Sequence, residues 1–262
     1  MVSLSSHVVV TTADESLLPQ ARLIAQRLGL SAKHHQDVME PNLIQLMMTP
    51  QGLVLKDPQA GEETPVKVDF TAAKLLYRCQ QAGAAKQSLA KAVGIKPGIR
   101  PSVIDATAGL GRDGFVLAAL GCQVCLVERN PVVVELLRDG LARASSHKYA
   151  GKVVQSCIKL ISENAVKFIE RLQEDERADV VYIDPMFPPR EKSARIKKEM
   201  RLFQSLVGVD EDFTQLLDVA LKSAKKRVVV KRPSKGPESE VRTPQLTITG
   251  KSTRYDIYFT HH

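Results

Sequence analysis

The chain has 262 residues, of which 44% are hydrophobic, and its formal net charge is +8. This length predicts one large domain or two small ones with a proper core. The sequence has no apolar run near the ~20 residues that cross a bilayer. Its first residues also lack the basic and long apolar regions of a signal peptide. These features argue against membrane and secreted classes, and we expect a soluble cytoplasmic protein.

The positive charge is concentrated in the second half of the chain. Seven Lys or Arg residues and no acid lie between Lys222 and Lys235. Six more, against two acids, lie between Arg190 and Arg201. Clustered positive charge favours a polyanionic partner such as a nucleic acid.

Cysteine usage predicts no metal or redox site. The chain has four cysteines, a number that fits a reduced compartment. Cys122 and Cys125 form a CxxC pair, but they lie in a predicted strand, where positions three apart point to opposite faces. We therefore expect no bound metal.

Residues 1–100 carry no clear catalytic motif. The expected elements, in chain order, are a strand at 7–12, a helix at 15–30 that ends at Gly29, a hairpin at 43–57 that turns at 50–52, and a helix at 71–94 with Gly83 as a candidate interruption. A linker is predicted at 96–101. We expect residues 1–95 to form an N-terminal α+β region, which is a candidate for substrate contact.

After Pro101, short apolar strands alternate with helices. The predicted strands are 102–109, 122–130, 157–164, 178–187 and 227–233, and the predicted helices are 112–121, 131–144, 165–174 and 211–224. This alternation predicts a mostly parallel sheet covered on both faces. The chain then forms a terminal antiparallel hairpin from 245–250 and 254–260. Residues 101–260 are therefore predicted to be an α/β, Rossmann-like domain.

A glycine-rich turn follows the first strand of this domain. Residues 109–114 read GLGRDG, which satisfies G-x-G-x-x-G through Gly109, Gly111 and Gly114. Glu128 ends the next strand, 19 residues after Gly109. Such glycines allow close approach of a ligand, and the acid accepts hydrogen bonds from ribose hydroxyls. The spacing predicts an adenosine-containing ligand; the structural alternative is a tight turn beside an exposed Glu.

Asp105 distinguishes between adenosine ligands. It lies four residues before Gly109, where a carboxylate would oppose the pyrophosphate of a nicotinamide cofactor. It would suit an ammonium group instead. S-adenosylmethionine carries an ammonium and a sulfonium and no phosphate, and Arg112 is a candidate to hold its carboxylate.

The stretch VVYIDPMFPPR, residues 180–190, runs from a predicted strand into a carboxylate and a kink. Ligands of open α/β sheets bind beyond the carboxyl ends of the strands. Four polar side chains are predicted at such ends: Asp105, Glu128, Asn164 and Asp184. We expect Asp184 and the residues after it to lie beside the cofactor, although an isolated strand-terminating turn would also explain the pattern.

Six segments together resemble the ribosomal RNA small subunit methyltransferase J family: DATAGLGRD, VERNPVV, YIDPMFP, KKEMRLFQSLVG, VVVKRP and RYDIY. The resemblance extends from residue 68 to the C-terminus and is looser before residue 65. It implies a Rossmann-like methyltransferase fold that uses S-adenosylmethionine. It also implies methylation of the exocyclic N2 of one guanosine in bacterial 16S ribosomal RNA, free or in the small subunit.

The resemblance also implies a set of cofactor contacts. They fall on Arg112, Asp113, Glu128, Arg129 and Asp184. Another pair aligns with Glu163 and Asn164, where the family usually has small hydroxyl residues. A second departure is the stretch 77–87, because related sequences often carry a more basic, glycine-rich segment there.

The expected chemistry is positioning of a weakly nucleophilic amine. Asp184 is predicted to accept a hydrogen bond from the amine, the Pro185 carbonyl to accept another, and Phe187 to stack on the base. This arrangement is similar to the [D/N]-P-P-[Y/F] motif of amino-methyltransferases, with Met186 in place of the second proline. The predicted RNA-phosphate contacts are Lys197, Lys198, Arg201, Lys231 and Arg232.

Three alternatives are left open by the residues alone. The DPMF motif by itself permits methylation of a DNA amine. A non-catalytic RNA-binding protein could retain such a cofactor fold. The glycine turn by itself also permits a nicotinamide-dependent oxidoreductase, although the terminal hairpin argues against that class.

Overall fold

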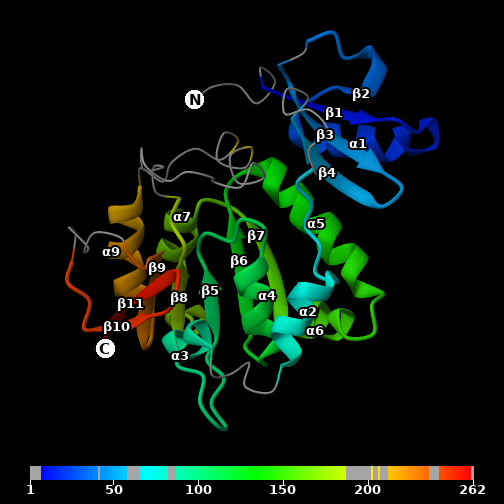
Figure 1. The fold of residues 1–262 in the computed structure, drawn as a ribbon. Helices are drawn as coiled ribbons and strands as arrows, with labels where there is room; N and C mark the ends of the chain where they lie inside the picture. The colour runs from blue at the N-terminus through cyan, green and yellow to red at the C-terminus, as the bar shows by residue number, and fades with distance from the viewer. Residues whose placement is uncertain are drawn as a thin grey trace. The chain divides into compact units, whose positions relative to one another are not determined.

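The computed structural model describes residues 7–40, 42–57, 65–81, 87–186, 202, 206, 212–235 and 242–260. The chain forms two compact units, which Figure 1 draws as a ribbon. Among the described residues, the first unit takes those within 1–69 and 131–143, with Leu202 and Leu206. The second takes those within 70–130, 144–187 and 209–262. The predicted domains 1–95 and 101–260 have different boundaries and stay a prediction.

The first unit is built on a four-stranded sheet of order β2-β1-β3-β4. Its strands are β1 (Val8–Thr12), β2 (Ala32–His34), β3 (Ile44–Thr49) and β4 (Gly52–Lys56). β1 is parallel to β2 and β3, whereas β3 and β4 form an antiparallel hairpin. Helix α1 (Leu18–Leu28) ends at Gly29, whose φ of 65° suits glycine. The predicted strand, helix and hairpin are confirmed.

The second unit contains a seven-stranded sheet of order β10-β11-β9-β8-β5-β6-β7. Its strands are β5 (Val103–Asp105), β6 (Val124–Glu128), β7 (Ile158–Ser162), β8 (Val180–Ile183), β9 (Arg227–Pro233), β10 (Leu246–Thr249) and β11 (Thr253–Phe259). β11 is antiparallel to β9 and β10, and the other strands are parallel. The predicted α/β class, the parallel sheet and the terminal hairpin are confirmed.

The helices of this unit pack on opposite faces of its sheet. They are α2 (Ala73–Gln80), α3 (Ser88–Val93), α4 (Arg112–Ala119), α6 (Ala150–Cys157), α7 (Ala165–Glu170) and α9 (Phe213–Ser223). One face packs against α7 and α9 through a buried cluster that includes Ile104, Val181 and Val230. The opposite face packs against α4. Since alternate residues of a strand point to alternate faces, Asp105 and Tyr182 lie on the α4 face.

One predicted helix is two helices in the structure, and one helix was not predicted. The helix predicted over 71–94 is two helices, α2 and α3; the candidate interruption Gly83 lies outside the described residues. Helix α6 was not predicted, because its β-branched Val153 and Val154 have low helix propensity. Helix α5 (Pro131–Ser145) begins at the predicted proline. In the described part of the chain, no helix has the length and apolar character needed to cross a membrane.

Candidate active site

The strand order reverses between β5 and β8, and the site lies at the carboxyl ends of these strands. β5 leads to β6 on one side, whereas β8 leads to β9 on the other. Such a reversal opens a crevice at the carboxyl edge of an α/β sheet. The glycine turn follows β5 and Asp184 follows β8, so the topology brings together the two motifs that the sequence separates by about 70 positions.

The glycine turn brings α4 close to the sheet. Gly111 precedes α4 with a φ of 71°, a left-handed conformation that glycine adopts without steric cost. Gly114 packs directly on the strands: a Cβ there would lie 2.3 Å from Leu126 Cδ2 and 3.1 Å from Asp105 Oδ2. Only glycine permits this approach, which brings the first turn of α4 and its backbone N–H groups to the end of β5.

Glu128 joins the glycine turn to the turn after β6. Its Oε2 accepts a hydrogen bond from the Gly109 N–H at 2.9 Å, and its Oε1 accepts one from the Asn130 N–H at 2.8 Å. The side chain is buried. Each carboxylate oxygen has a second acceptor position, so Glu128 is chemically suited to ribose hydroxyls, in agreement with the predicted adenosine ligand.

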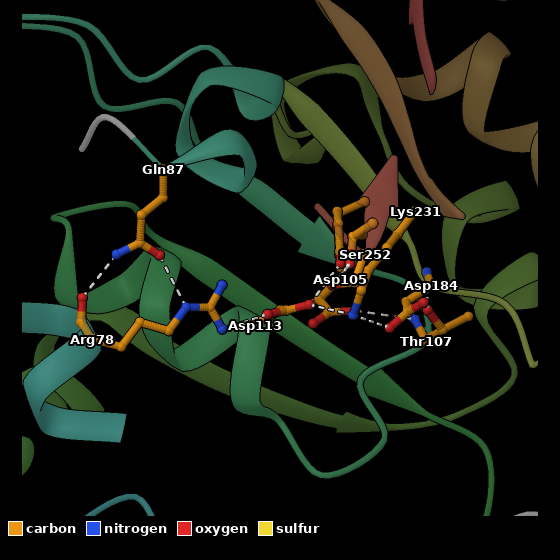
Figure 2. Close-up of polar contacts among 10 residues, drawn as sticks. Arg78, Gln87, Asp105, Thr107, Asp113, Asp184, Lys231 and Ser252 are labelled. Atoms are coloured by element: carbon orange, nitrogen blue, oxygen red, sulfur yellow. Dashed lines mark hydrogen bonds and ion pairs between the residues drawn. The ribbon is translucent and has the colours of Figure 1, made fainter. Parts of the chain in front are cut away.

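Lys231 links two of the predicted carboxylates. Its Nζ lies 2.8 Å from Asp113 Oδ2 and 2.6 Å from Asp184 Oδ2. Asp113 also accepts hydrogen bonds from the Tyr182 hydroxyl at 2.8 Å and from Arg78 Nη1 at 3.1 Å. Figure 2 shows the chain of contacts from Gln87 through Arg78 and Asp113 to Lys231 and Asp184. We call Arg78, Asp113, Tyr182, Asp184 and Lys231 the charge cluster.

Burial and the neighbouring charges shift the pKa values of Asp113 and Lys231 in opposite directions. Burial raises the pKa of Asp113, but Lys231, Arg78 and the Tyr182 hydroxyl outweigh it, and the net pKa is lowered. Burial lowers the pKa of Lys231, but Asp113 and Asp184 outweigh it, and the net pKa is raised. Burial, followed by the charge of Asp113, holds the pKa of Tyr182 well above its usual range. The lysine and Asp113 are therefore charged at neutral pH, and the tyrosine is neutral.

The Asp105 carboxyl is deeply buried, since the residue is only 2% exposed. Burial and then the charge of Asp113 raise its pKa to about 8. The carboxyl is therefore mostly protonated at neutral pH. Its predicted direct contact with an ammonium group stays a prediction; the described geometry places it beneath the glycine turn.

The start of the DPMF stretch is tied to the turn after β5. The Asp184 backbone N–H donates to Thr107 Oγ1 at 2.7 Å, which ties the end of β8 to the turn after β5. Pro185 is buried and Met186 is partly buried. Phe187, which was predicted to stack on a base, lies outside the described residues, as do Lys197, Lys198 and Arg201.

The remaining predicted cofactor contacts have other partners. Arg129 pairs with Asp212 at 2.9 Å, and the Asn164 amide nitrogen donates to the same carboxylate at 3.2 Å. Asn164 also caps α7 through the Lys167 N–H. Glu163 pairs with Arg171 at 2.8 Å. Their cofactor roles, like that of Arg112 in the first turn of α4, stay predictions.

Lys231 and Arg232 are the two described residues that were predicted to bind RNA phosphate, and their side chains have different surroundings. Lys231 belongs to the charge cluster. Arg232, the next residue on β9, is buried and pairs with Asp256 at 3.1 Å, and its guanidinium lies over the Phe213 ring. Alternation along the strand separates the two side chains. Their RNA contacts stay predictions.

Sequence reasoning missed three residues of the site: Arg78, Thr107 and Tyr182. Tyr182 precedes Asp184 by two positions, and period-two alternation could have placed it on the same face. Thr107 lies two residues before the glycine motif and has no motif meaning of its own. Arg78 lies 35 positions before Asp113, and no local signal joins the two.

Comparisons with known proteins agree with this geometry. Residues 24–260 match a family model described as "Putative SAM-dependent methyltransferase". A ribosomal RNA small subunit methyltransferase J from Pseudomonas syringae pv. syringae is 48% identical over 91% of this chain and 86% of its own length. The corresponding protein of Thioalkalivibrio sulfidiphilus is 43% identical over 97% and 98%. The crystal structure of a SAM-dependent methyltransferase from Neisseria gonorrhoeae, 35% identical, matches 97% of this chain and 96% of its own with a TM-score of 0.72.

Proposed function

Since the chain belongs to the ribosomal RNA small subunit methyltransferase J family of S-adenosylmethionine-dependent enzymes, we propose that it methylates the exocyclic N2 of a guanosine in 16S ribosomal RNA. Relatives at 43% and 48% identity carry the name of a small subunit RNA enzyme. The proposed substrate is this RNA, alone or in the small subunit, and a ribosomal substrate implies a cytoplasmic reaction.

One observation carries the proposal for the chemistry, namely the position of Asp184. Its carboxylate ends β8 at the reversal of strand order, its backbone is tied to the glycine turn through Thr107, and Lys231 contacts its Oδ2. A carboxylate held there is placed to accept a hydrogen bond from an amine brought to the cofactor. That bond draws the nitrogen lone pair out of conjugation with the purine ring.

The fit to S-adenosylmethionine rests on the donor and acceptor set. Glu128 offers carboxylate oxygens for ribose hydroxyls, and the first turn of α4 offers backbone N–H groups to a carboxylate. Asp105, with its pKa near 8, becomes an anion when a cationic ligand binds nearby. We expect cofactor binding to release a proton near neutral pH for this reason.

The cofactor supplies a methyl group on a sulfonium. During transfer the sulfur–carbon bond breaks while the bond to N2 forms, and the sulfonium becomes a neutral thioether. N2 then loses one proton, which passes to water. The chain positions the amine, and well-oriented attack can lower the barrier by ~7–11 kcal/mol. A target base must also leave its stack, which costs a few kcal/mol.

The test is tritiated methyl transfer from S-adenosylmethionine to small subunits from a strain that lacks this enzyme. We expect one labelled N2-methylguanosine per subunit, located by mapping the digested RNA. Small subunits from the parent strain are the control and should accept no label. Label on a different nucleoside, or none with the intact enzyme, would reject the proposed substrate.

A further inference from the structure

The register of β9 against β8 places Lys231 at the site. In the parallel pair of β8 and β9, Ile183 is opposite Val230, so Asp184, just after β8, lies beside Lys231 within β9. On its other side Lys231 is opposite Tyr255 of β11. Strands on both sides of β9 therefore fix the backbone from which the lysine reaches Asp184.

The ammonium lies beneath the carboxylate that faces solvent. Exposed fractions of the side chains rise from 15% for Asp113 through 27% for Lys231 to 41% for Asp184. Lys231 Nζ, the less exposed of the two groups, contacts Asp184 Oδ2 at 2.6 Å. Charge-assisted hydrogen bonds of this kind are short and directional.

The other partner of Lys231 is itself anchored. Asp113 accepts from the Tyr182 hydroxyl and from Arg78, and Gln87 Oε1 in turn accepts from Arg78 Nε at 3.0 Å. The lysine is therefore a bridge between a fixed carboxylate and the one at the crevice. Without this bridge, the charges of Asp113 and Asp184 would repel each other in a partly buried site.

We propose that Lys231 is a positioning residue for methyl transfer, which holds the Asp184 carboxylate in place to accept a hydrogen bond from the amine. This inference rests on the proposed function. It differs from a phosphate contact, because the lysine acts through Asp184 and not on the RNA. The charge-paired carboxylate serves as a hydrogen-bond acceptor, and the proton of the amine goes to water.

The decisive experiment compares Lys231→Met with the intact enzyme at saturating S-adenosylmethionine, with kcat and KM measured for unmodified small subunits. We expect kcat to fall about 30-fold, the scale of one charge-assisted hydrogen bond. The acid limb of the kcat–pH profile should move to higher pH, since the Asp184 carboxylate loses its cation while Asp113, Asp105 and the Tyr182 hydroxyl stay nearby in both proteins. Lys231→Arg should restore part of kcat.

A phosphate contact would give a different pattern. In that case Lys231→Met would raise KM, leave kcat and its pH profile unchanged, and reduce the salt slope of RNA binding by about one. That result would overturn the inference. The matched control is Lys226→Met, which removes the same charge just before β9, where Lys226 pairs with Asp179 at 2.9 Å. It should leave kcat unchanged.

A double variant tests whether Lys231 acts through Asp184. Adding Lys231→Met to Asp184→Asn should cost less than about 3-fold further, because coupled residues are not additive. A further loss of about 30-fold would contradict the mechanism. If Lys231→Met lowers the thermal unfolding midpoint, Lys231→Gln, which keeps a hydrogen-bond donor, provides the same kcat and pH measurements.

Failure of the inference is distinguishable from failure of the proposed function. If the intact enzyme makes no N2-methylguanosine, the proposed function is rejected. If the intact enzyme makes it and the Lys231 variants keep its kcat and pH profile, only the positioning role is rejected.

Discussion

Glu128 and Asp184 end two strands of the same sheet, but their carboxylates are held in different ways. Glu128 accepts from two backbone N–H groups, those of Gly109 and Asn130. Asp184 contacts the ammonium of Lys231, which also serves Asp113. Backbone donors keep their protons at every working pH, whereas the Lys231 contacts depend on the charge of three side chains.

The difference indicates how the site divides its tasks. The hydrogen bonds that hold Glu128 come from the backbone. This half of the site is therefore already formed before a ligand binds, which suits a cofactor that is the same in every reaction. The half around Asp184 depends on ionised side chains, so single substitutions and pH changes act there most strongly. Substitutions at the individual carboxylates test this difference.

The largest effect is expected at the solvent-facing carboxylate. Asp184→Asn keeps the shape of the side chain but removes the anionic acceptor, so kcat should fall about 100-fold or more. Affinity for S-adenosylmethionine, measured by calorimetry, should change less than about 10-fold. Asp175→Asn, at an exposed position, is the matched control. An unchanged kcat in Asp184→Asn would remove this residue from the mechanism.

Glu128→Gln should weaken cofactor binding and spare the chemistry. An amide nitrogen in place of one oxygen would face a backbone N–H group, so one hydrogen bond to Gly109 or Asn130 is lost. We expect about 10- to 100-fold weaker binding of S-adenosylmethionine, with kcat at saturation reduced far less. Glu170→Gln, exposed at the end of α7, is the control. Unchanged binding with a lower thermal midpoint would make Glu128 a structural brace only.

Asp105→Asn should flatten the pH dependence of stability. Burial and the charge of Asp113 raise the pKa of Asp105 from its ordinary 3.8 to about 8. The folded protein therefore holds a proton that the unfolded chain has lost, and stability from this group falls as pH rises from about 4 to about 8. Between pH 6 and 8 the free energy of unfolding should fall about 2 kcal/mol more in the intact protein than in the variant.

Denaturant unfolding at the two pH values measures this difference. A parallel fall in both proteins would mean that Asp105 titrates near its ordinary value. The Lys231 and Asp113 pair does not obscure the result, because both groups stay charged between pH 6 and 8.

The smallest effect is expected at Glu163. Its carboxylate pairs with Arg171 on the surface, and exposed pairs contribute ~0–1 kcal/mol. Glu163→Gln should therefore change cofactor affinity less than about 3-fold. Arg171→Gln breaks the same pair from the other side and is the matched control. A loss of tenfold or more in Glu163→Gln alone would establish the direct cofactor contact that the family resemblance implies.

Several features were readable from local patterns. Alternating apolar strands and helices predicted the parallel sheet, and the polar segment 251–253 predicted the terminal hairpin, which β10 and β11 form. The glycine spacing and the acid at the end of β6 predicted a ligand site at the correct edge. Helix α6 was missed because its valines resemble the strand that follows, and only packing against α4 and β7 selects the helix.

The order of amino acids was enough to predict which residues end the strands, because hydrophobic periodicity and glycine conformation are properties of short segments. It did not determine which of those ends touch. Lys231 looked like one member of a basic cluster, and Arg78 like one charge on a helix. Only the register of β9 against β8 brings Lys231 to Asp184, and only the packing of α2 near α4 brings Arg78 to Asp113. Ion pairs between distant segments depend on a few ångströms of tertiary geometry, which no local pattern encodes.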